Sequence, residues 1–139
     1  MAYPTVAGPY GFQPINLIGG QVFAGSTRNY PIQYGYATNI FYGDIVNIIR
    51  GSIVDNADTT DSTGTGIVGV FLGCSYTNPT TKQKQFAQYW PAGTAAGDCQ
   101  AIVCDDPDTV FKTVAVATGT TTVSSVSALL IGQNVAGTA

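Results

Sequence analysis

The residues of this chain that could carry chemistry are three cysteines and two groups of aspartates. The 139-residue sequence contains no histidine and no glutamate. Without an imidazole, neither a Ser-His-Asp nor a Cys-His arrangement can form within the chain. General acid–base catalysis also depends largely on the groups that are missing. We therefore expect a protein that is not an enzyme and has no catalytic residues.

The cysteines are odd in number and irregularly spaced, at Cys74, Cys99 and Cys104. No CxxC pair occurs, which argues against a zinc site. Cys99 and Cys104 could bridge across a turn. However, cysteine often behaves as a small buried hydrophobic residue, and a chain made in a cytoplasm keeps its thiols reduced. We expect three reduced cysteines in the core.

Two groups of three aspartates fall in predicted loops: Asp55, Asp58 and Asp61 in one, and Asp105, Asp106 and Asp108 in the other. The first group lacks the spacing and the closing glutamate of a calcium-binding EF-hand. The second group could bind a divalent cation, but it surrounds Pro107, which suits the second position of a type I turn. We expect a solvated loop and a plain turn, and neither a metal nor another cofactor.

A glycine pattern at residues 64–69 matches GxGxxG but precedes a predicted strand. A phosphate cradle needs that pattern after a strand and at the start of a helix. The better interpretation is a flexible loop followed by a tightly packed strand.

The charge is low, with 9% charged residues and a net charge of −3. Its five cations form no run, so no nucleic-acid partner is expected: Arg28, Arg50, Lys82, Lys84 and Lys112. The apolar runs are far shorter than the roughly 20 residues of a membrane helix, and no secretory signal is visible. A surface with so few charges exposes apolar patches, which favours contact with other proteins.

The chain is organised around residues 35–49, where two apolar runs flank a Gly43-Asp44 turn. Four β-branched residues follow the turn, which favours a strand. Residues 66–74 have the same character. We predict that these runs form the central strands, with further strands at residues 28–34, 82–90, 100–104 and 110–116. Pro31 should place its strand at an edge.

The expected fold is therefore all-β, a compact β-barrel or sandwich of short antiparallel strands. Residues 100–104 and 110–116 can form a second hairpin. Residues 118–139 are rich in Thr, Ser, Ala and Gly. Around residues 127–131 this stretch fits a short strand or a short helix equally well.

Residues 1–27 read as an extended N-terminal arm preceding a β-rich domain at residues 28–139. Alternating prolines and glycines disfavour regular structure there. The arm also carries aromatic residues, which a free disordered tail would lack. They either dock onto a neighbouring subunit or fold back as a lid on their own core. The candidate partner-contact residues are Tyr3, Pro4, Tyr10, Phe12 and Phe23.

Five segments carry a family resemblance: residues 10–14, 35–44, 66–76, 85–91 and 105–107. In these segments the chain resembles small virion structural proteins of tailed bacteriophages, particularly marine short-tailed phages. The order of Gly-Asp turn, strand, polar loop and Val-Gly-Val-Phe strand is also similar to that of head decoration (cement) proteins. The resemblance covers most of residues 10–135.

The resemblance implies a homotrimer, made in the host cytoplasm, that sits on the capsid exterior. Its partner would be the phage major capsid protein, whose lattice it would brace. Two other functions stay open. One is a tail-tube, adaptor or fibre-base subunit. The other is a module that binds cell-surface glycans through an aromatic platform of Tyr89 and Trp90, although Trp90 also suits core packing.

Overall fold

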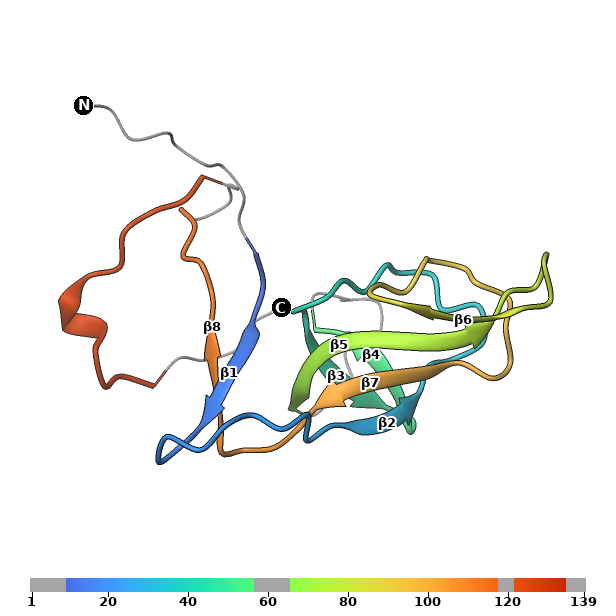
Figure 1. Cartoon of the computed structure of the whole chain (residues 1–139). Coiled ribbons are helices and arrows are strands. Elements are labelled where there is room, and N and C mark those ends of the chain that lie inside the picture. Colours follow the sequence, from blue (N-terminus) through green and yellow to red (C-terminus); the bar gives the residue numbers. More distant parts are fainter. Residues whose placement is uncertain (1–9, 57–65, 118–121, 135–139) are drawn as a thin grey trace, which may run out of the picture.

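The computed structural model describes residues 10–56, 66–117 and 122–134 of the chain. The prediction of an all-β protein is confirmed, because the described residues form two antiparallel sheets of short strands and one single-turn helix (Figure 1). The elements are β1 (Gln13–Leu17), β2 (Arg28–Pro31), β3 (Ile45–Ile49), β4 (Ser52–Asp55), β5 (Ile67–Thr77), β6 (Lys84–Ala87), β7 (Gln100–Cys104), β8 (Thr109–Lys112) and the 3-10 helix η1 (Ala128–Leu130).

The larger sheet is built around β5, the longest strand. Its order is β2-β7-β5-β3-β4, and β6 pairs with the C-terminal half of β5. β2, which ends in Pro31, lies at an edge as predicted. The sheet curls until β2 and β4 approach at one parallel bridge, Ile32 to Ile53. The ladder does not close there, so the fold is sandwich-like and the barrel alternative is wrong.

Tight packing explains the first glycine of β5, Gly69. A Cβ atom at Gly69 would collide with the carbonyl oxygen of Cys104 on β7. Gly69 belongs to the GxGxxG pattern, and its place in the sheet agrees with the interpretation as a packed strand. Residue 64, the first glycine of that pattern, lies outside the described residues.

The core centres on Trp90, which is fully buried with Phe71 and Ile40. Ile40 and Trp90 exchange two backbone hydrogen bonds, of 2.7 and 3.2 Å. The indole Nε1–H of Trp90 donates to the carbonyl of Tyr36 at 3.3 Å. Its ring meets that of Tyr76 edge to face, with centroids 5.7 Å apart. One tryptophan therefore joins the loop before β3, the loop after β6 and the sheet.

The three cysteines are free and buried, as expected, and no bridge joins Cys99 to Cys104. The Cys74 thiol donates to the carbonyl of Tyr89 at 3.3 Å. Burial raises the pKa of Cys74 to about 11, because a thiolate loses its hydration there.

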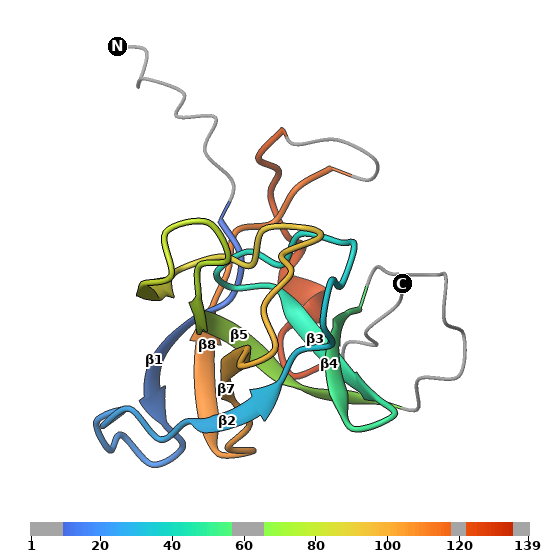
Figure 2. The same ribbon diagram turned by 90° about the vertical axis from the view of Figure 1, so that its right-hand side faces the viewer.

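The smaller sheet is a two-stranded ribbon of β1 and β8, hereafter the ribbon. It stands to one side of the larger sheet (Figures 1 and 2). Two expectations fail here. Regular structure does form within residues 1–27, because the exposed backbone groups of β1 find partners in β8. Residues 100–104 and 110–116 do not form a hairpin, because β7 and β8 lie in different sheets. Of the two alternatives at residues 127–131, the structure has the helical one.

Asp98 joins β5 and β6 to the loop between β6 and β7. Its carboxylate accepts from the backbone N–H of Thr77 at 3.0 Å and from the Thr77 hydroxyl at 2.6 Å. The Lys84 ammonium lies 3.3 Å away. These hydrogen bonds, those from Thr77 foremost, lower the pKa of Asp98 from its ordinary 3.8 to about 2.

We expect Asp98→Asn to lower the melting temperature near neutral pH and to have little effect in strong acid. A lowered folded-state pKa stabilises the protein above the unfolded pKa, and that stability is lost as the pH falls through the folded value. The difference from wild type should therefore shrink as the pH falls from about 4 to about 2. Thermal unfolding over this pH range measures the difference. Asp108→Asn is the matched control, because it also removes an exposed carboxylate. A difference in melting temperature that stays constant over this pH range would contradict the lowered pKa of Asp98.

The buried thiols should resist an aqueous aromatic disulfide reagent at about pH 8, because neither the reagent nor solvent reaches them. We expect no stoichiometric labelling of the folded protein within minutes. All three thiols should react after unfolding in guanidinium chloride. Rapid native labelling of Cys74 would show that the sheet opens far more readily than its burial implies.

Candidate interaction surface

The ribbon is too small to bury its own side chains. Its register runs from Gln13 opposite Lys112 to Leu17 opposite Thr109, with a bulge between Pro14 and Asn16. An isolated two-stranded ribbon is marginally stable in water. In this ribbon Ile15 and Val110 remain exposed. The ribbon therefore needs support from elsewhere.

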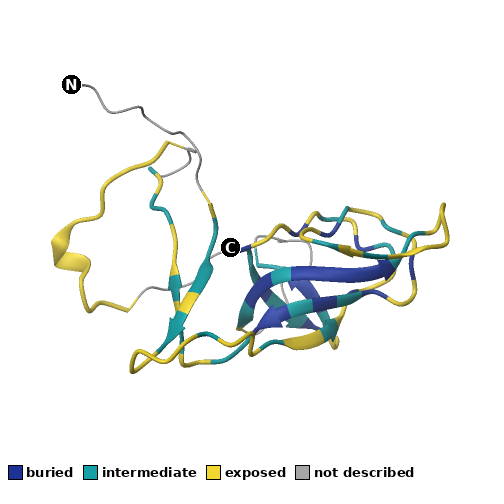
Figure 3. Cartoon of the chain, viewed as in Figure 1, coloured by how far each residue is buried: buried dark blue, intermediate teal, exposed yellow. Residues whose placement is uncertain are grey.

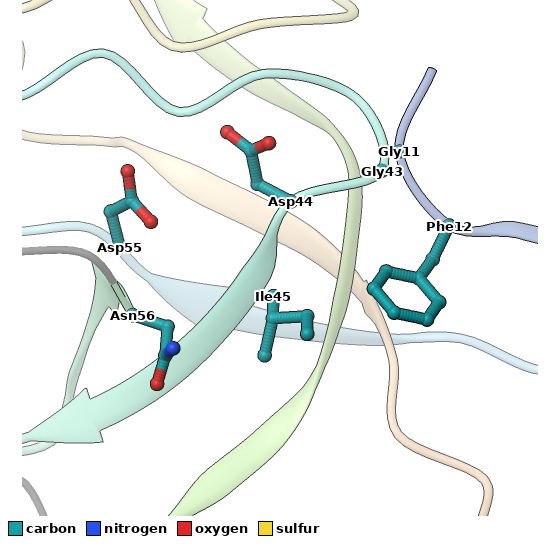
Figure 4. A pocket seen from close by; sticks show the side chains of 7 residues that line it. All are labelled: Gly11, Phe12, Gly43, Asp44, Ile45, Asp55 and Asn56. Carbon is teal, nitrogen blue, oxygen red and sulfur yellow. The ribbon is translucent and has the colours of Figure 1, made fainter. Parts of the chain in front are cut away.

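Part of that support is a contact between two glycines, Gly11 and Gly43 (Figure 4). The backbone N–H of Phe12 donates to the carbonyl of Gly43 at 2.9 Å. A Cβ atom at Gly11 would lie 2.6 Å from that carbonyl oxygen. Gly43 has a φ of +89°, which side chains rarely tolerate. We call this contact the glycine latch; it ties the start of the ribbon to the turn before β3.

An open hollow of about 310 Å³ lies beside the glycine latch (Figure 4). It is lined by Gly11, Phe12, Gly43, Asp44, Ile45, Asp55 and Asn56. Asp44 accepts from the backbone N–H of Phe41 at 2.8 Å. Burial raises the pKa of the Asp44 carboxyl, and the negative charge of Asp55 raises it further. The polar groups of the lining side chains are two carboxylates and one amide.

The predicted aspartate groups do not assemble into a metal site in the part of the chain that the structure describes. Asp105 accepts from the Tyr30 hydroxyl at 2.6 Å and pairs with Arg28 at 3.4 Å. The backbone N–H of Thr109 donates to the carbonyl of Asp106 at 3.2 Å, which closes the expected turn, and the Asp106 carboxylate accepts from the backbone N–H of Asp108 at 2.9 Å. Asp58 and Asp61 lie outside the described residues. Within the same limits, no helix has the length and apolar character needed to cross a bilayer.

The predicted partner-contact residues lie in different surroundings. Tyr10 is exposed, and its ring centroid is 5.6 Å from the Lys112 Nζ. Phe12 packs edge to face against Phe111 with centroids 6.1 Å apart. Phe23 is partly buried in the loop between β1 and β2. Tyr3 and Pro4 lie outside the described residues. The structure thus brings Tyr10 and Phe12 to β8, and leaves Phe23 on a separate loop.

The sequence analysis missed exposed apolar residues in two parts of the chain. One part is the ribbon with its loop, and the other is residues 122–134, hereafter the C-terminal segment, which is exposed throughout (Figure 3). The exposed apolar residues of these two parts are Ile15, Ile18, Val22, Val110, Val123, Val126, Leu129, Leu130 and Ile131. The available signal was the Leu-Leu-Ile run at residues 129–131, standing alone in a stretch of small polar residues. The sequence predicted only a short strand or a short helix there, and not that its apolar side chains are exposed.

A smaller aromatic patch lies over the core. The rings of Phe41 and Tyr89 stack with centroids 6.0 Å apart and planes inclined by 18°, and both are exposed. Trp90, the next residue, is fully buried. Core packing of Trp90 is therefore the correct alternative, and Tyr89 and Trp90 do not form an exposed aromatic platform.

Comparisons with protein-family models, with curated proteins and with solved structures find no match to this chain. The chain is a nearly all-β protein with a buried core, free buried cysteines and an apolar surface on the ribbon and the C-terminal segment.

The glycine latch can be tested with Gly11→Ala. The added Cβ should force the backbones of residues 11 and 43 apart and break the hydrogen bond between Phe12 and Gly43. We expect amide exchange at Phe12 to accelerate by roughly tenfold or more, which corresponds to about 1.4 kcal/mol of lost protection. Hydrogen exchange followed by NMR measures this.

Gly97→Ala is the matched control, because a Cβ there meets nothing within 4 Å. It should leave exchange at Phe12 unchanged. Equal protection of Phe12 in the wild type and in Gly11→Ala would refute the glycine latch.

Proposed function

We propose that this protein is a virion structural protein, a capsid decoration protein that binds the outer surface of the major capsid protein lattice as a homotrimer and stabilises the head. The observation that supports this most is the apolar surface of the ribbon and the C-terminal segment, on a chain with only 9% charged residues. Large exposed apolar patches are typical of protein–protein contact sites.

The composition of this surface fits a protein interface. The centres of interfaces are depleted of Lys, Glu and Asp and enriched in large apolar side chains. The C-terminal segment contains no charged residue, and Leu129, Leu130 and Ile131 are all exposed. A permanent partner would bury these side chains, whereas water leaves them unfavourably hydrated.

We assign the contact with the capsid to the N-terminal arm and its aromatic residues. Tyr10 is exposed at the start of the ribbon. Tyr3 and Pro4 precede it in the chain, and Phe23 lies on the loop after β1. The glycine latch holds the backbone at Gly11 and Phe12, so the residues before it start from a fixed point on the body. Fixing one end of a binding segment reduces the entropy lost on docking.

A second candidate function is glycan binding, favoured by the exposed stacked rings of Phe41 and Tyr89. It explains the aromatic patch but leaves the larger apolar surface unused. Two results together would favour glycan binding over decoration: the wild type binds glycans but not capsids, and Phe41→Ser loses the glycan binding.

The decisive experiment mixes the purified protein with expanded heads that lack it, built from the major capsid protein of the phage that encodes it. We expect saturable co-sedimentation of the full-length chain. Removal of residues 1–9, which keeps the glycine latch intact, should lower the occupancy by roughly tenfold or more, since interface contacts concentrate in a few aromatic residues. The emission of Trp90 reports whether the truncated body remains folded.

Phe86→Ser is the matched control, because Phe86 is 77% exposed on β6 and takes no part in the proposed contact. It should bind like the wild type. Failure of the full-length chain to bind heads would overturn the decoration function. Normal occupancy of the truncated chain would overturn the role of the arm alone.

A further inference from the structure

The C-terminal segment has apolar side chains that the described residues of its own chain leave exposed. Every residue from 122 to 134 is exposed, and Leu129 and Ile131 reach 85% and 82%. The segment lies on the side of β8 that faces away from the larger sheet (Figure 1). It therefore adds nothing to the core that holds the rest of the molecule.

Local hydrogen bonds nevertheless give the segment a defined shape. The Ser127 hydroxyl oxygen accepts from the backbone N–H of Leu129 at 3.3 Å, and the Ser127 carbonyl accepts from Leu130 at 3.0 Å. The N–H of Gln133 donates to the carbonyl of Leu130 at 3.1 Å. These bonds join residues of the segment to one another and form η1. A preformed turn that presents leucine and isoleucine loses less entropy on binding than a free coil.

A second apolar surface, of the same chemistry, lies on the ribbon and its loop. Ile15, Ile18, Val22 and Val110 are exposed there. β8 has a ladder partner on one edge only, β1, within the described part of the chain. Each copy of the chain thus carries one apolar segment and one apolar ribbon, and neither covers the other.

We propose that the C-terminal segment of one copy packs against the ribbon of a second copy, head to tail, in a ring that closes on itself. This deepens the proposed function, because it names the contact that holds the homotrimer together. Head-to-tail contacts form closed rings when the rotation between copies allows it, and closure leaves no segment and no ribbon uncovered.

Charge and area both favour a second copy as the occupant. The segment carries no charge and the strands of the ribbon carry only Lys112, so no like charges meet when two copies associate. From their exposed fractions, the nine apolar residues of one junction expose on the order of 1,000 Å² together. This matches the apolar share of a standard interface of about 1,600 Å². A foreign partner would need to cover two separate surfaces on each chain.

Sedimentation velocity over a concentration series tests the contact with the variant Leu129→Ser/Ile131→Ser. The wild type should sediment at a multiple of the 14.4 kDa chain mass. The variant should sediment largely at 14.4 kDa, with the dissociation constant raised by roughly 100-fold or more for two lost apolar side chains. Both residues are exposed in the single chain, so the body should stay folded, as the emission of Trp90 will show.

The matched control is Tyr34→Ser/Phe86→Ser, which removes two exposed rings outside this surface and should associate like the wild type. A wild type at 14.4 kDa at every concentration would overturn the inference, as would unchanged association of the segment variant. Isotope-filtered NOEs in a mixed sample should connect methyl groups of the segment to Ile15 and Val110 of another copy. Purely intramolecular NOEs would also overturn it.

The head-binding experiment separates this inference from the proposed function. A chain that associates through the segment but does not bind heads would refute decoration and support the contact between copies. A monomeric chain that binds heads would refute the contact between copies and support decoration.

Discussion

The body of this protein depends on the burial of Trp90. Its backbone pairs with Ile40, its indole N–H reaches Tyr36, and its ring lies against Tyr76. Tyr36 and Ile40 belong to the loop before β3 and Tyr76 belongs to β5, so Trp90 joins that loop to the curled sheet. A buried tryptophan stabilises a small domain both through its large apolar area and through the hydrogen bond of its N–H group. The loops on either side of it are thereby fixed without any disulfide.

The ribbon, in contrast to the body, has no core of its own. Its ladder satisfies backbone hydrogen bonds, yet two strands cannot enclose a core, so Ile15 and Val110 stay in contact with water. The body supports the ribbon at the glycine latch. The side chains of the ribbon gain little from this backbone contact. The molecule therefore divides into a part that is complete alone and a part that becomes complete by association.

The sequence predicts the strands far better than their partners. Runs of β-branched residues identify β3, β5 and β7, because their apolar character is local information. The pairing of β1 with β8 joins residues about a hundred positions apart, and no local pattern encodes it. Prolines and glycines in residues 1–27 pointed away from a strand, yet tertiary pairing overrode that preference, as it often does for short strands. Tyr89 is exposed and Trp90 is buried for a reason that is also not local: the backbone of Trp90 pairs with that of Ile40.

The glycine latch couples these two parts of the molecule. Phe12 bonds to Gly43, and Gly43 in turn donates its N–H to the carbonyl of Phe71 at 2.8 Å in the middle of β5. A contact that orders the ribbon therefore also restrains the turn that leads into β3. Any partner that binds the folded protein and not the unfolded chain stabilises the fold by mass action. Association through the ribbon would thus add stability to the body across the glycine latch, although the partner never touches the core.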